Sequence, residues 1–218
     1  MDDVREQLSH ILWIGGGPGA GKTTLARELA RTYRLRIYSL DQRGADDHRL
    51  RPGGVPAGWD DLSMDARWLG PSPEALFDRM IAVWTARWRY VIDDLLELPA
   101  DRPIIAEGPG ALPWCVAPVI RSPRQAIFLV PIPERREALL ARRHRDAPGD
   151  RLERRTSDPE RAGRNLEERD ARIARRIVAS CHDLGLRFER LEATRDLGES
   201  LSLLVAHFGP YVPAELDR

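Results

Sequence analysis

A glycine-rich stretch near the start of the chain constrains the fold more than any other feature. Residues 16–23 read GGPGAGKT and match the pattern G-x-x-x-x-G-K-[ST] at every fixed position. An apolar run at 10–16 precedes the stretch, and helix-forming residues at 23–34 follow it. The glycines let successive backbone N–H groups turn toward one anion, which the start of the following helix also attracts. The stretch therefore predicts a phosphate-binding loop between a strand and a helix.

The side chains of this loop suit a nucleoside triphosphate with its Mg²⁺. Lys22 is expected to reach the β- and γ-phosphates, and the Thr23 hydroxyl to bind Mg²⁺. Lys22 is the only lysine beside 33 arginines, and a planar guanidinium cannot replace an ammonium in a tight phosphate cradle. We expect nucleotide contacts along the whole loop, from Gly17, Pro18, Gly19, Ala20, Gly21, Lys22, Thr23 and Thr24.

The sequence excludes several classes of nucleotide-binding protein. The guanine-reading motif N-K-x-D needs a second lysine, which this chain lacks. A D-x-x-G match at 146–149 lies in an arginine-rich region and does not follow a strand, and the motif LSGGQ of transporter ATPases is absent. A chain of 218 residues is also short for the accessory parts of most motor ATPases. ATP is the expected nucleotide.

Strand-like and helix-like segments alternate along the rest of the chain. Short apolar runs predict further strands at 35–41, 102–110, 125–133 and 185–193, and apolar periodicity predicts helices at 73–98, 134–145, 160–184 and 197–208. Residues 42–61 are polar and rich in glycine and proline, which indicates a loop or short helix. This order predicts an α/β P-loop fold, a five-stranded parallel sheet with helices on both faces. We expect one domain spanning 1–218.

Two acidic residues follow predicted strands, where ligands of open parallel sheets bind. They are Asp41 in YSLD and Glu107 in IIAEG. At these positions the chain resembles small-molecule and nucleotide kinases of the P-loop superfamily, of the uridine-kinase, shikimate-kinase and chloramphenicol-phosphotransferase types. The resemblance implies that Asp41 contacts the acceptor hydroxyl or the metal shell and that Glu107 contacts Mg²⁺ or substrate. Phosphoryl transfer likewise needs a carboxylate to take the acceptor proton, although either acid could instead cap a helix.

The resemblance also implies a lid at about 134–176 and an acceptor-binding insert at about 42–98. The lid region holds 14 arginines against 10 acids, so arginines could close over the phosphates there, although a solvated helix face is the usual interpretation of such a run. Candidate phosphate contacts are Arg143, Arg151, Arg164 and Arg169, of which Arg169 is favoured as catalytic, with Asp170 available to orient a neighbour. Asp93 and Asp94 are expected on a solvated face of the helix at 73–98.

Aromatic and basic residues of the insert are candidates for the acceptor site. Trp59 and Trp68 lie in loop-like surroundings and are expected to line a pocket, whereas Trp84 and Trp88 are one helical turn apart and are expected in the core. Basic candidates for acceptor contacts are His48, Arg49 and Arg51. After the last strand, the resemblance places Thr194 and Arg195 where such kinases contact adenine.

The overall composition limits the partners. The net charge is +0, so the molecule as a whole does not attract nucleic acid or an anionic membrane. No apolar run approaches the roughly 18 residues that span a bilayer, and the start of the chain lacks a signal-peptide layout. We expect a cytoplasmic protein, with a homodimer possible.

The sequence thus predicts an ATP- and Mg²⁺-dependent kinase for a small molecule with a hydroxyl or phosphate acceptor. Three alternatives stay open at this point. One is a nucleoside or nucleotide kinase, another is a regulatory ATPase that transfers phosphate to no metabolite, and the third is a polynucleotide 5′-kinase.

Overall fold

A single parallel sheet forms the centre of the protein. The computed structural model describes residues 2–134, 155–192 and 195–212. Within them the sheet has the strand order β2-β3-β1-β4-β5, and every neighbouring pair is parallel. Its strands are β1 (Ile11–Gly16), β2 (Arg36–Ser39), β3 (Ile104–Glu107), β4 (Ala126–Pro131) and β5 (Arg187–Leu191). The predicted five-stranded α/β fold is confirmed.

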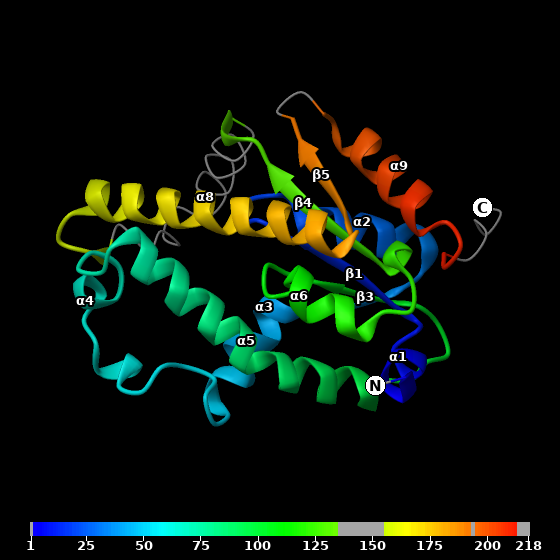
Figure 1. Ribbon diagram of the computed structural model, residues 1–218, viewed down its shortest axis with the longest axis horizontal. Coiled ribbons are helices and arrows are strands. Elements are labelled where there is room, and N and C mark those ends of the chain that lie inside the picture. The colour runs from blue at the N-terminus through cyan, green and yellow to red at the C-terminus, as the bar shows by residue number, and fades with distance from the viewer. Residues whose placement is uncertain (1, 135–154, 193–194, 213–218) are drawn as a thin grey trace.

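Helices cover both faces of the sheet (Figure 1). One face packs on α2 (Lys22–Tyr33) and α9 (Leu197–Phe208), and the other on α1 (Asp2–Gln7), α5 (Pro73–Glu97), α6 (Pro113–Val116) and α8 (Pro159–Leu184). Side chains alternate along a strand, so β1 serves both cores. Its Leu12 and Ile14 pack toward α2 and α9, whereas Ile11 and Trp13 pack toward α5 and α8.

The two longest helices, α5 and α8, lie on the same face of the sheet. Ser72 caps α5 by accepting a hydrogen bond from the Ala75 N–H, and Asp158 caps α8 through the Arg161 N–H. Gly185 ends α8 with a positive φ of 64°, a conformation that suits glycine. The two helices pack against each other. Neither they nor any other helix in the described ranges is long and apolar enough to cross a membrane.

The segment at 42–61 contains short helical turns, within the loop or short helix expected there. They are the end of α3 (Leu40–Asp46), η1 (His48–Leu50) and η2 (Trp59–Asp61), and α4 (Met64–Trp68) follows. The strand predicted at 35–41 ends earlier, because Leu40 and Asp41 already belong to the first turn of α3. The turns η3 (Ala117–Val119) and η4 (Pro123–Gln125) lead from α6 into β4. The helix predicted at 134–145 lies outside the described residues apart from its first position.

Candidate functional site

The predicted phosphate loop joins β1 to α2 and begins against the neighbouring strand β4. Gly16 has a φ of +127°, and a Cβ there would lie 2.0 Å from the Leu129 carbonyl oxygen, so only glycine fits. The Gly17 N–H donates to the same carbonyl at 2.9 Å. Gly21, the residue before α2, has a φ of 77° and provides no side-chain cap. The first amides of α2 therefore lack a side-chain acceptor and suit an anion.

Lys22 lies buried in the first turn of α2, with 6% of its surface exposed. Its Nζ donates to the Gly17 carbonyl at 2.8 Å, which turns the ammonium back over the loop. Burial lowers the pKa of Lys22, and Asp41, Glu107 and Asp170 oppose that shift in decreasing order. Carboxylates of α3, β3 and α8 thus lie near enough to the loop lysine to raise its pKa.

Glu107 ends β3, the strand next to β1, and is 1% exposed. Its Oε2 accepts a hydrogen bond from Thr23 Oγ1 at 3.0 Å. Its Oε1 is buried and has no hydrogen-bond partner among the described residues. A carboxylate oxygen and a hydroxyl are the hard ligands that Mg²⁺ takes, and an unpaired buried oxygen is costly without such a partner. The residues here fit the predicted Mg²⁺.

Asp41 is exposed at the second position of α3, close enough to influence the charge of Lys22. The residue before α3, Ser39, makes no side-chain cap, so an acid in the first turn also suits the helix dipole. The structure brings Asp41 and Glu107 to the same end of the strands as Lys22.

Asp170 of α8 binds the favoured lid arginine. Arg169 donates to Asp170 Oδ1 through Nε at 2.8 Å and through Nη2 at 2.6 Å, and both side chains are almost buried. Asp170 also lies near enough to Lys22 to raise the pKa of that lysine. Arg164 instead lies on the surface, 3.9 Å from Glu160.

Other basic candidates have different surroundings. Arg195 lies 3.8 Å from Glu189 of β5, and the structure does not test a contact with adenine. The predicted phosphate contacts Arg143 and Arg151, and Thr194 beside Arg195, fall outside the described residues.

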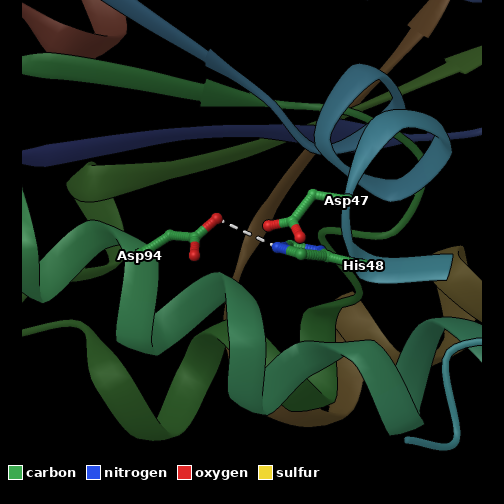
Figure 2. Close-up of side chains that lie close together, drawn as sticks. All are labelled: Asp47, His48 and Asp94. Atoms are coloured by element: carbon green, nitrogen blue, oxygen red, sulfur yellow. Dashed lines mark hydrogen bonds and ion pairs between the residues drawn. The ribbon is translucent and has the colours of Figure 1, made fainter. Parts of the chain in front are cut away.

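Asp94 corrects the sequence prediction of a solvated helix face. Its neighbour Asp93 is exposed, but Asp94 is 8% exposed and accepts hydrogen bonds from Tyr38 Oη at 2.8 Å and Arg43 Nε at 3.0 Å. His48 Nε2 lies 2.9 Å from the same carboxylate (Figure 2). Burial opposes ionisation of Asp94, but these hydrogen bonds outweigh it and lower the pKa of Asp94. The prediction failed because Asp94 follows Val91 by one helical turn and shares its buried face.

The same cluster holds a possible metal-ligand set, Asp47, His48 and Asp94, whose ligand atoms lie within 4.8 Å of one another. Arg51 lies 2.5 Å from Asp47 and 3.4 Å from Asp94, and Arg43 contacts both carboxylates. Two guanidinium groups therefore balance the two carboxylates. This cluster joins the segment around Asp41 to α5 as an ion-pair network.

A small pocket lies beside Asp41, and one of the two tryptophans expected in the core lines it. Trp84 lines the pocket while it packs against the core, and Trp88 packs on the buried Trp13 with ring centroids 5.2 Å apart, as expected of a core residue. Trp59 and Trp68 instead contact each other edge to face at 5.5 Å, and Arg79 lies over both rings. The full lining is Leu40, Asp41, His48, Trp84, Arg87, Val91 and Gly110.

Of the basic residues predicted to contact an acceptor, only His48 lines this pocket. Arg49 and Arg51 pair with Asp60 and Asp47. Arg87, which also lines the pocket, was not identified from the sequence. Arg87 follows Trp84 by three residues and so lies on the apolar face of the helix, where a charged residue indicates a specific partner or ligand.

Solved structures similar to this chain include a kinase and an uncharacterised protein. A shikimate kinase from Acinetobacter baumannii, solved with shikimate, is 18% identical with a TM-score of 0.45 and covers 94% of this chain and 98% of its own. An uncharacterised protein from Eubacterium ventriosum is 12% identical with a TM-score of 0.46 and covers 92% and 98%. At this level of similarity neither indicates a reaction or an acceptor for this chain. No protein-family model and no curated protein matches the sequence.

Proposed function

We propose that this protein is an ATP- and Mg²⁺-dependent phosphotransferase that acts on a small molecule with a hydroxyl or phosphate acceptor. The observation that carries the proposal is that Glu107 bonds Thr23 of the phosphate loop at the end of the strands where Asp41 lines a pocket. A protein that binds nucleotide without transferring phosphate would not need Asp41 or the pocket that Asp41 lines.

The donor side consists of the phosphate loop and two metal-binding groups. Backbone amides of the loop and Lys22 would hold the phosphates, and Thr23 with Glu107 would hold Mg²⁺. When bound, Mg²⁺ would neutralise charge on the phosphate oxygens. Glu107 would need little rearrangement to bind Mg²⁺, because its Oε2 already accepts a hydrogen bond from the Thr23 hydroxyl at 3.0 Å.

On the acceptor side, Asp41 would accept the proton of the acceptor hydroxyl. A bond forms between the acceptor oxygen and the γ-phosphorus, and the bond from that phosphorus to the bridging oxygen of ADP breaks. Arg169, held by Asp170, would neutralise charge on the moving phosphoryl group. Lys22 would stabilise the same charge from the loop side.

The proposal is tested with pooled metabolites and two aspartate variants of α3. Purified protein, ATP and Mg²⁺ are incubated with pools of hydroxy acids, polyols, nucleosides and nucleotides, and products that gain one phosphoryl group are identified by mass spectrometry. Asp41→Asn should lose about 100-fold or more in transfer while ATP binding persists. The exposed Asp46 ends the same helix, so Asp46→Asn is the matched control.

Two results would redirect the proposal. Steady ATP hydrolysis without any phosphorylated product would favour the regulatory ATPase, and products from the nucleoside or nucleotide pools alone would favour a nucleoside or nucleotide kinase. Unchanged transfer by Asp41→Asn would remove Asp41 from the role of base.

A further inference from the structure

Arg87 projects from the middle of α5 into the pocket beside Asp41. Its Nε donates to the Gly54 carbonyl at 2.7 Å. Among the described residues, its two terminal amino groups form no hydrogen bond and no ion pair with a carboxylate. The guanidinium thus has a fixed position and two donor groups that remain to be used.

Gly44 of α3 lies directly against this guanidinium. Gly44 follows Asp41 by three residues in α3, so the two share a face of that helix. A Cβ on Gly44 would lie 2.9 Å from Arg87 Nη1. The missing side chain lets the guanidinium rest against the helix face that carries Asp41.

The charges around Arg87 also favour an anion. Burial is the main cause that lowers the pKa of Arg87, the nearby Arg49 lowers it further, and Asp41 opposes both. Arg49 itself is paired with Asp60 at 2.7 Å. A half-buried cation without a close counter-ion is costly, and a bound anion relieves that cost.

The remaining walls of the pocket are mostly apolar. Leu40, Trp84 and Val91 form them, and Gly110 closes the pocket so near Trp84 that a Cβ there would lie 3.4 Å from the indole. His48 also lines the pocket, but its Nε2 faces Asp94. The polar edge therefore consists of a carboxylate for a hydroxyl and a guanidinium for an anion.

We propose that the acceptor is a small hydroxylated metabolite that carries a carboxylate or phosphate group, which Arg87 binds while Asp41 faces the hydroxyl. This inference rests on the proposed transfer function for the role of Asp41, but anion binding by Arg87 can be measured without transfer. The forked donors of arginine suit both anions, since each offers two oxygens in one plane.

The experiment compares anionic compounds with neutral relatives. One arm uses hydroxy carboxylic acids against their methyl esters, and a second uses sugar phosphates against the free sugars. Each compound is tested for thermal stabilisation of the full chain with Mg²⁺ and a non-hydrolysable ATP analogue, and for phosphorylation with Mg²⁺ and ATP. We expect stabilisation and product from one anionic class, which identifies the anion.

Variants of Arg87 attribute the effect to this side chain. Arg87→Met should raise the acceptor KM about 100-fold with the KM for ATP unchanged, and Arg87→Lys should restore part of the loss. Arg89→Met is the matched control, because Arg89 is exposed two residues further along α5 and also bonds the insert, at the Pro52 carbonyl. The unchanged KM for ATP in each variant verifies its fold.

The outcomes separate this inference from the proposed function. Stabilisation by anions in the wild type but not in Arg87→Met, without any product, supports the anion site and refutes transfer. Phosphorylated products from the neutral compounds, made equally well by Arg87→Met, refute the anion site and support transfer. No stabilisation and no product would overturn both.

Discussion

The Thr23 hydroxyl donates to Glu107 Oε2 at 3.0 Å and so joins the start of α2 to the end of β3, two segments 84 residues apart. The other oxygen of Glu107 is buried without a hydrogen-bond partner in the described part of the chain. A metal ion beside this carboxylate would give that oxygen a partner, which is the physical reason to expect Mg²⁺ here.

Replacement of Glu107 by Gln should therefore impair the use of Mg²⁺ specifically. The amide keeps the shape and one carbonyl oxygen but loses the charge, so the Mg²⁺ concentration for half-maximal turnover should rise at least about 10-fold. ATP binding measured without Mg²⁺ should stay within about 2-fold, because Lys22 and the loop amides are unchanged. Turnover titrated with Mg²⁺ and calorimetry with ATP give the two readouts, and an unchanged Mg²⁺ titration would remove Glu107 from the metal site.

Lys22→Arg is expected to reduce turnover strongly although the positive charge is kept. Lys22 is buried and bonds the Gly17 carbonyl at 2.8 Å, so a broader guanidinium would displace the loop. We expect a loss of about 100-fold or more in turnover, with Arg31→Lys on the exposed side of α2 as the reverse control. Steady-state hydrolysis or transfer measures the effect, and near-normal turnover by Lys22→Arg would show that catalysis does not require the ammonium of Lys22.

Asp94→Asn should destabilise the protein through the hydrogen-bond and ion-pair network that surrounds Asp94. The change leaves the Tyr38 hydroxyl, Arg43 and His48 facing an uncharged group. Arg43 is 43% exposed and water screens its pair, so we expect a loss of about 2 kcal/mol in the free energy of unfolding. Urea unfolding at neutral pH measures it.

The control is Asp93→Asn, an exposed neighbour on the same helix, which should change stability by less than about 0.5 kcal/mol.

The dependence of stability on acidic pH provides a second readout for Asp94. The pKa of folded Asp94 is lowered, so its contribution is complete above the ordinary carboxyl pKa, near 4, and is lost as the pH falls through the lowered value. The stability gap between wild type and Asp94→Asn should narrow below pH of about 4, and a constant gap would contradict this assignment.

The sheet and the phosphate loop could be predicted because their signals are local. Short apolar runs bounded by glycine and proline fix the strands, and the spacing of glycines with Lys22 and Thr23 fixes the loop. The same signals also predict that Asp41 and Glu107 lie near each other, since the carboxyl ends of parallel strands lie at one edge of the sheet. That step used topology and needed no side-chain geometry.

The pocket beside Asp41 was harder to predict, because its lining depends on how α5 is rotated against the sheet. The helix is amphipathic over 25 residues, and its apolar stripe also contains Trp84, Arg87 and Asp94. Whether such a residue faces core, pocket or water is decided by its partners, here Gly44, Gly54 and Tyr38 from distant segments. Sequence spacing along one helix does not contain that information.

His207 should make the protein more sensitive to mild acid. It is 5% exposed in α9, and its Nε2–H donates to the Ala126 carbonyl at 2.9 Å. Burial is the main cause that lowers the pKa of His207, and Arg187 and Arg124 add to it, while the hydrogen bond to Ala126 and Glu189 oppose it. A lowered pKa means that the unfolded chain binds the proton more tightly, so stability is complete above about pH 6.5 and falls as the pH drops below it. The slope from this one group is at most about 1.4 kcal/mol per pH unit.

His207→Gln keeps a donor for the carbonyl but does not titrate, so urea unfolding between about pH 7 and pH 5 should show a shallower loss of stability than in the wild type. His182→Gln, at the exposed end of α8, is the control, and parallel curves for wild type and His207→Gln would show that His207 is not the group that senses acid.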